Sequence, residues 1–114
     1  MSQLHKTPGE VDVYGTFRKH LGPRFSEAGL GIQFHSNQQP GIRFKVDVAS
    51  EYREAIQKGL QDAMLLRFPD YSESISIWVT RVEAHEVNSS WMAFYQAARM
   101  VADQAYSLAQ ASVD

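Results

Sequence analysis

The alternation of apolar and polar side chains predicts four β-strands. Residues 11–18 and 30–35 place apolar side chains at every second position, which is the period of a strand with one buried face. The same alternation recurs at residues 42–48 and 75–82. Gly15 falls on the apolar face of the first strand, where a glycine marks close packing or a bulge.

Polar, turn-forming segments separate the first three of these strands. Residues 19–24 contain Gly22 and Pro23 with cations clustered around them, and we expect a turn there. Residues 37–41 read Asn-Gln-Gln-Pro-Gly, a composition typical of a hairpin loop. This composition predicts a hairpin between the second and third strands.

Apolar residues at helical spacing predict two helices. The first follows Ser50, whose hydroxyl is suited to capping a first turn. Gly59 lies inside this helix and costs about 1 kcal/mol relative to alanine in an exposed helix interior; we expect it to let the helix approach the sheet closely. The second helix starts at Asn88-Ser89-Ser90. The element order is β-β-β-α-β-α, with both helices on one face of a four-stranded sheet.

Length and composition fit one domain with one hydrophobic core. The chain has 114 residues and no cysteine, which excludes disulfides, thiol nucleophiles and cysteine-ligated zinc. Residues 1–9 predict a flexible N-terminus, and residues 10–110 predict the domain. No stretch resembles a signal peptide or is long enough to span a bilayer, so we expect a cytoplasmic protein with no membrane partner.

Charge and motif spacing exclude several kinds of site. The formal net charge is −2, so no global positive field indicates nucleic-acid binding. The histidines, at positions 5, 20, 35 and 85, lack metal-ligand spacing. The sequence contains no Gly-x-x-x-x-Gly-Lys-Ser/Thr loop. We expect no metal, no cofactor and no GTPase activity.

Two segments resemble domain IV of elongation factor G. Residues 85–94 (HEVNSSWMAF) are similar to a helix start at which that family has a histidine, an acid, a valine, a serine pair after Asp or Asn, and Met-Ala-Phe. Residues 51–63 (EYREAIQKGLQDA) are similar to the family's other helix, with its Glu-Tyr start and its Lys-Gly. Trp91 stands where the family usually has an acidic or polar residue. The resemblance covers roughly residues 10 to 109.

This resemblance implies an α+β fold of the ribosomal protein S5 domain 2-like type, with a left-handed β-α-β crossover. It also implies a translation-related module that reaches RNA through a tip built from two loops. His85 matches the family's tip histidine. The family's other tip loop is long and glycine-rich, whereas this chain has a short connection at residues 19–29 without that motif.

The predicted tip is a contact site for RNA or another anion. Free N–H groups at a helix N-terminus attract anions, and nearby cations strengthen that attraction. The alternative is a solvated turn with ordinary surface charge, since Glu27, Glu83 and Glu86 dilute the positive field. The residues of the predicted tip are Arg18, Lys19, His20, Arg24, His85, Asn88, Ser89 and Ser90.

Two aromatic residues near the start of the last helix have two interpretations. Trp91 and Tyr95 are four positions apart, and if exposed they would stack on a base or contact a partner. The alternative is that both are partly buried at a helix edge.

Three functions remain open at this stage. The first is a stand-alone module that binds the ribosome or structured RNA through the His85 tip. The second is a small bacterial accessory enzyme of a biosynthetic pathway, with a pocket on the sheet or beside the last helix. No arrangement of residues indicates a particular reaction, so no catalytic residue is assigned. The third is a homodimer or protein-interaction domain that uses the open face of the sheet. That polar face carries Tyr14, Gln33, His35, Arg43, Lys45 and Trp78.

Overall fold

The computed structural model describes residues 11–21, 24–35, 39, 41–67, 75–84 and 89–113, and the predicted flexible segment at residues 1–9 lies outside them. The element order β-β-β-α-β-α is confirmed. The elements are β1 (Val11–Leu21), β2 (Arg24–His35), β3 (Gly41–Phe44), α1 (Ser50–Arg67), β4 (Ser76–Ala84) and α2 (Trp91–Val113).

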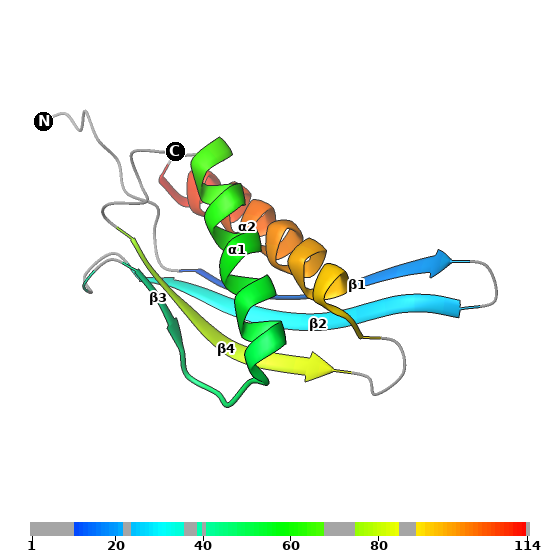
Figure 1. The fold of residues 1–114 in the computed structure, drawn as a ribbon. Helices are drawn as coiled ribbons and strands as arrows, with labels where there is room; N and C mark the ends of the chain where they lie inside the picture. Colours follow the sequence, from blue (N-terminus) through cyan, green and yellow to red (C-terminus); the bar gives the residue numbers. More distant parts are fainter. Residues whose placement is uncertain are drawn as a thin grey trace, which may run out of the picture.

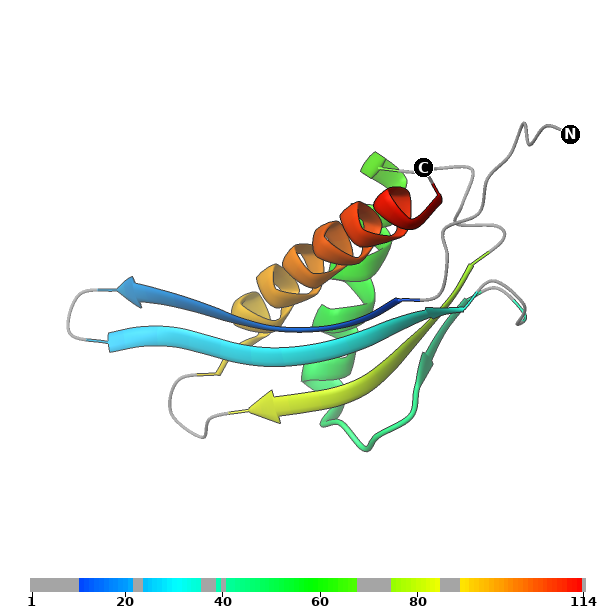
Figure 2. The ribbon, with the colours of Figure 1, turned by 180° about the vertical axis from the view of Figure 1, so that it is seen from behind.

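The strands form one mixed sheet in the order β1-β2-β4-β3. The β1–β2 and β2–β4 pairs are antiparallel, and β3 pairs with β4 in parallel. The hairpin predicted around residues 37–41 is therefore wrong: β4 lies between β2 and β3, so the two strands do not pair with each other. Both helices cover the same face of this sheet (Figure 1), as predicted. Seen from behind, the other face carries neither of the two described helices (Figure 2). The described part of the chain is therefore a two-layer α+β domain with one open sheet face.

The crossover from β3 through α1 to β4 is left-handed. When the two parallel strands point upward and the helices face the viewer, β4 lies to the left of β3, and Figures 1 and 2 agree on this arrangement. Most β-α-β crossovers are right-handed. The handedness is the one that the resemblance to domain IV of elongation factor G implied.

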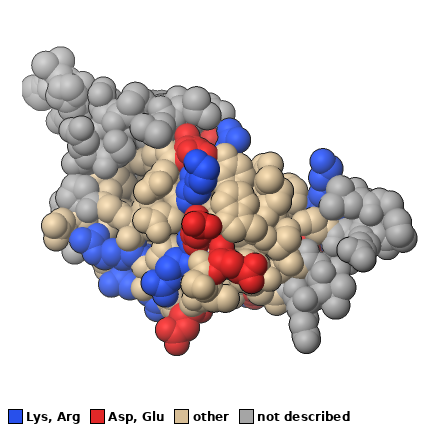
Figure 3. All heavy atoms as spheres, in the orientation of Figure 1, with Lys and Arg blue, Asp and Glu red and all other residues tan. Residues whose placement is uncertain are grey.

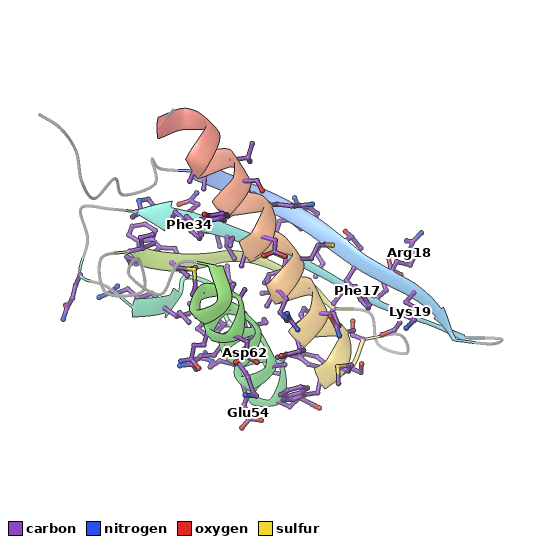
Figure 4. All side chains as sticks on the ribbon, turned by 90° about the horizontal axis from the view of Figure 1, so that it is seen from above. Phe17, Arg18, Lys19, Phe34, Glu54 and Asp62 are labelled. Carbon is purple, nitrogen blue, oxygen red and sulfur yellow. The ribbon has the colours of Figure 1, made fainter. Side chains whose placement is uncertain are left out.

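The core lies between the sheet and the helices and is built from the apolar positions of the predicted pattern. Phe34, labelled in Figure 4, is 1% exposed. Burial of a side chain of this size stabilises a fold by about 1.5–3 kcal/mol. Other core residues that are completely buried include Leu30, Ile32, Ile56, Leu60, Val79, Phe94 and Val101.

The ends of several elements differ from the predictions. β1 and β2 extend through residues 19–21 and 24–29, which were predicted as a connection. β3 ends at Phe44, earlier than the apolar alternation suggested, because the backbone bends at residues 45–46. The carbonyl of Ala49 accepts hydrogen bonds from the amides of Tyr52 and Arg53 at 3.0 and 2.9 Å. Ala49 therefore occupies the N-cap position, one residue before the predicted Ser50.

Two glycines mark places where elements pack closely. A Cβ atom on Gly15 would lie 3.0 Å from Met100 Cε of α2, which confirms the predicted close packing. A Cβ atom on Gly59 would lie 2.5 Å from the Tyr95 carbonyl oxygen and 2.7 Å from Ala98 Cβ. The predicted partner of Gly59 was wrong: this glycine brings α1 close to α2 rather than to the sheet.

Replacing Gly59 with alanine tests this helix contact. Alanine has the better helix propensity by about 1 kcal/mol, but its methyl group would overlap a backbone atom of α2. We expect Gly59→Ala to lower the free energy of unfolding by about 1–3 kcal/mol, measured by urea denaturation. Gln57→Ala, an exposed site on the same helix, is the matched control and should stay within about 0.5 kcal/mol of wild type. A Gly59→Ala protein as stable as wild type would contradict the packing.

Candidate nucleic-acid interface

β1 and β2 continue past β4 as a two-stranded hairpin. The β2–β4 pairing ends at Ala28, whereas the β1–β2 pairing continues to Leu21 and Arg24. The part that extends past β4, residues 18–21 and 24–27, is called the free hairpin below. Four residues in a strand span about 13 Å. Figure 1 shows that the hairpin projects beyond the helices.

The free hairpin carries part of the predicted tip. Arg18 and Lys19 lie on it with exposed side chains, and both are labelled in Figure 4. His20 and Arg24 belong to the same two strands, but their side chains lie outside the described residues. Most of the turn predicted at residues 19–24 is thus strand: β1 continues to Leu21 and β2 starts at Arg24. Gly22 and Pro23 lie outside the described residues.

Glu27 connects the free hairpin to the start of α2. Its side chain is only 7% exposed, and its carboxylate accepts a hydrogen bond of 2.6 Å from Arg18 Nη2. Its backbone carbonyl accepts a hydrogen bond of 2.7 Å from the hydroxyl of Ser89. Ala84, the last residue of β4, pairs with Ala28. The residues on both sides of the β4–α2 connection are therefore held at the base of the free hairpin.

The predicted start of the last helix is correct. The hydroxyl of Ser90 accepts a hydrogen bond from the Ala93 amide at 3.1 Å, and the Ser90 carbonyl accepts one from Phe94 at 3.1 Å. Ser90 is thus the N-cap. The first turn of α2 contains no acidic residue, so the positive end of its dipole is not neutralised within that turn. His85 and Asn88 lie outside the described residues.

The cations of the free hairpin differ in their surroundings. The Arg18 guanidinium shares its charge with the nearly buried Glu27 carboxylate, which reduces the positive field of the tip. Lys19 lies next to it on the exposed strand. For Arg18, this ion pair favours the interpretation as ordinary surface charge. Lys19 is then the cation of the free hairpin best suited to bind an anion.

Trp91 and Tyr95 pack at the seam between the two helices. Their rings are stacked, with centroids 5.4 Å apart and planes 13° apart. Trp91 Nε1 donates to Glu54 of α1 at 3.1 Å, and the Tyr95 hydroxyl donates to Asp62 of α1 at 2.6 Å; both acids are labelled in Figure 4. Both aromatics are half-buried. Their arrangement matches the alternative of partial burial at a helix edge.

A second set of polar and aromatic residues lies on the open sheet face. The ring of Trp78 of β4 packs against the ring of His35 of β2, with centroids 3.9 Å apart and planes tilted by 32°. The ammonium group of Lys45 lies 4.2 Å from the centroid of the same indole. Trp78 Nε1 donates to the hydroxyl of Ser76 at 3.0 Å, and Arg43 Nη1 donates to the same oxygen at 2.8 Å. These five residues are called the Trp78 cluster.

Tyr14 bridges three strands of the open face. Its ring covers Gly29 and Gly31 of β2, since a Cβ atom on Gly29 would lie 2.3 Å from the Tyr14 hydroxyl and one on Gly31 would lie 3.4 Å from Tyr14 Cδ1. The hydroxyl donates to Glu83 Oε1 of β4 at 2.6 Å. The Arg81 guanidinium lies 4.2 Å from the ring centroid and donates to Glu83 through Nε at 3.1 Å.

Burial and the neighbouring carboxylate change the proton affinity of Tyr14. Burial raises the pKa of Tyr14 above its usual 10.0, and the hydrogen bond to Glu83 raises it further. The Glu83 carboxylate also raises the pKa of Arg81. The sequence alone did not reveal this bridge, although two glycines spaced two apart on one strand were a signal of close side-chain approach from a neighbour.

Two cavities bear on the alternative of an enzyme. One, of about 500 Å³, lies between α1 and β3–β4, and its lining includes Ile42, Met64 and Ile77. The other, of about 570 Å³, lies between β1 and α2, beside Asp12 and Asp103. Among the described residues, neither cavity is lined by a histidine.

The described ranges contain neither a metal-binding cluster nor a helix suited to span a membrane. No group of three or more histidine, aspartate or glutamate side chains there is placed to hold a metal ion. In the same part of the chain, no helix has the length and apolar character needed to cross a membrane.

The fold of this chain is similar to that of a solved structure, the crystal structure of a protein from Thermus thermophilus, with a TM-score of 0.74 and 20% sequence identity. The alignment covers 90% of this chain but 17% of the Thermus chain, so the fold occurs there as one part of a larger protein. No protein-family model matches the sequence. No curated protein matches it either.

The raised pKa of Tyr14 predicts a loss of stability at high pH. Folding favours the protonated phenol, so this contribution is complete below the unfolded pKa and is lost as pH rises through the folded pKa. We expect urea denaturation to show wild type losing more stability than Tyr14→Phe as pH rises above about 10. The two proteins should have parallel pH dependence between about pH 7 and 9. Parallel curves at all pH values would contradict the pKa shift.

Proposed function

We propose that this chain is a non-catalytic, translation-factor-like module that binds the ribosome or another structured RNA. In this proposal the contact surface is the tip formed by the free hairpin and the start of α2. The module has no GTPase of its own. The observation that carries the proposal is the joint anchoring of both tip segments on Glu27.

That anchoring supports an RNA contact because it gives a projecting element a fixed position. A hairpin that extends past the end of β4 would otherwise bend about its base. The Arg18–Glu27 ion pair and the Ser89 hydrogen bond hold the base from two sides. A narrow ribbon held in this way reaches into concave surfaces that the body of the domain is too broad to enter.

The chemistry of the tip favours phosphate as the group it contacts. Lys19 presents a mobile ammonium group, which binds phosphate as a point charge. The N-terminal amides of α2 point toward the same end, and helix N-termini attract phosphate oxygens. His85 is predicted from the resemblance to stand between these two elements. A small number of phosphate contacts gives weak binding that is strongly dependent on salt.

The resemblance supports the same class of partner. The tip motif at residues 85–94 is the segment in which this chain most resembles domain IV of elongation factor G. The fold also occurs as a minor part of a much larger solved chain, which is compatible with a domain that works beside others.

Binding to purified small ribosomal subunits tests the proposal. We expect saturable binding. The logarithm of the binding constant should fall linearly with the logarithm of the salt concentration, because binding releases counterions. Lys19→Ala should weaken binding and reduce the slope of that line by about 1. His85→Ala should weaken binding at every salt concentration.

Lys58→Ala is the control for charge. Lys58 is an exposed cation on α1, 3.7 Å from Asp62, and lies away from the tip. Its replacement changes the net charge as Lys19→Ala does, but should leave ribosome binding unchanged. Absence of binding at low salt, or equal losses for Lys19→Ala and Lys58→Ala, would refute the proposed tip contact.

A further inference from the structure

The indole of Trp78 is held upright on the open sheet face between two neighbours. β4 lies between β2 and β3 in the sheet. His35 belongs to β2, and Lys45 follows β3, so the two residues come from strands on opposite sides of β4. The ring centroid of His35 is 3.9 Å away, and the Lys45 ammonium nitrogen is 4.2 Å from the indole centroid. The indole thus has an imidazole and an exposed cation as neighbours.

The imidazole is fixed more firmly than the lysine. His35 Nε2 is hydrogen-bonded to Gln33 Oε1 at 2.9 Å, and Gln33 Nε2 donates to Asp12 Oδ2 at 3.3 Å. Lys45 is exposed and lies in a bend after β3. A cation–π contact at an exposed site is weaker than the stacking of a base on an aromatic side chain. A nucleobase would therefore displace the Lys45 ammonium group from the indole.

Arg43 stands next to this face in a fixed position. Its register partner across the parallel pair is Trp78. Its Nη1 donates to the buried hydroxyl of Ser76 at 2.8 Å and to the carbonyl of Gln39 at 2.7 Å. A guanidinium group has five N–H donors, so an arginine anchored through one nitrogen keeps further donors for a ligand. A pre-positioned arginine loses little entropy when it binds a phosphate.

The charge next to Trp78 favours an anionic ligand. Figure 3 shows Lys and Arg side chains over β3, and both cations and carboxylates over α1. The cations there include Arg43, Lys45 and Arg53, whose guanidinium lies 4.9 Å from the ring centroid of Phe44. The carboxylates of the same segment are Asp47, Glu51 and Glu54, which are exposed and equal these cations in number. The positive charge beside Trp78 is therefore local and comes from Arg43 and Lys45.

We propose that the Trp78 cluster binds single-stranded RNA. An unpaired base stacks on the indole in place of the Lys45 ammonium group, and Lys45 and Arg43 contact the phosphates on either side of that base. Aromatic stacking combined with cations along the backbone is the usual way in which a sheet surface holds a single strand. The choice of RNA rests on the proposed function. The site itself is distinct from the tip, because it lies on the open face and at the β3 edge.

Tryptophan fluorescence tests this inference directly. The chain has two tryptophans, so Trp91→Phe leaves Trp78 as the only indole. Titration of this variant with a uridine oligonucleotide, which forms little structure of its own, should quench its emission in a saturable manner. Loss of stacking in Trp78→Leu should weaken binding of the same oligonucleotide about 5- to 150-fold, as measured by fluorescence anisotropy of a labelled strand.

Lys45→Glu provides a second variant that does not disturb packing, because Lys45 is exposed. We expect it to weaken oligonucleotide binding and to lower its salt dependence. Lys58→Glu, the same charge reversal at an exposed site on α1, is the matched control and should bind the oligonucleotide as wild type does. Trp78→Leu should in turn retain its affinity for small ribosomal subunits through the tip.

The outcomes separate this inference from the proposed function. If ribosomal subunits bind but the oligonucleotide neither binds nor quenches Trp78, the Trp78 site is refuted and the tip contact stands. If the oligonucleotide binds and both Trp78→Leu and Lys45→Glu bind it equally well, the site is refuted too. A dimer in solution that Trp78→Leu dissociates would also overturn it, since the open face would then be covered. If neither RNA binds, both proposals fail.

Discussion

A single apolar sheet face must be covered by two helices, and this requirement sets the arrangement of the whole domain. α2 crosses β1 and β2, while α1 packs mainly against α2. Gly59 and Ala98 let the two helices pack closely on that face, because the α1 backbone approaches α2 at a point where a methyl group would overlap the Tyr95 carbonyl. With both helices on one side, the opposite sheet face stays open.

The two candidate RNA-contact surfaces follow from this arrangement. Since neither α1 nor α2 covers the open face, its outward positions carry polar and aromatic side chains that bond one another, as in the Tyr14 bridge and the Trp78 cluster. Since α2 starts beside Ala28, its N-terminus is attached to the base of the free hairpin through Ser89 and Glu27. The tip and the open face therefore belong to the same domain but present different chemistry. The tip has an exposed lysine and the N-terminal amides of α2. The open face has the packed rings of the Trp78 cluster and an anchored arginine.

Local patterns were sufficient to predict the elements and their order. The alternation through Leu30, Ile32 and Phe34 correctly identified a strand with one buried face, and the Ser90 N-cap followed from its residue type and the apolar stripe behind it. The length of the hairpin was not predictable in this way. Beyond β4 the two-stranded ribbon projects past the helices, so the sequence loses the alternation that marks a strand packed on the core.

Contacts that depend on register or on helix crossing were also beyond a reading of the sequence. Gly59 was expected to face the sheet because periodicity shows which face of a helix is apolar but not which element covers it. Trp91 and Tyr95 are bonded to two acids of α1, a pairing between helices far apart in the chain. Tyr14 lies on Gly29 and Gly31 only because of the strand register. Similar reasoning applies to the Trp78 cluster, whose members come from three strands and a bend.

The most direct measurement of the central claim is site-specific radical footprinting of the small ribosomal subunit. The chain has no cysteine, so Ser26→Cys places a single iron chelate on the free hairpin, and Ser107→Cys places the same probe on the exposed side of α2 as a control. If the tip contacts RNA, the Ser26→Cys probe cleaves a compact set of ribosomal RNA positions, and the Ser107→Cys probe does not cleave them. Equal cleavage by both probes, or no cleavage from Ser26→Cys while the protein is bound, would contradict a tip contact.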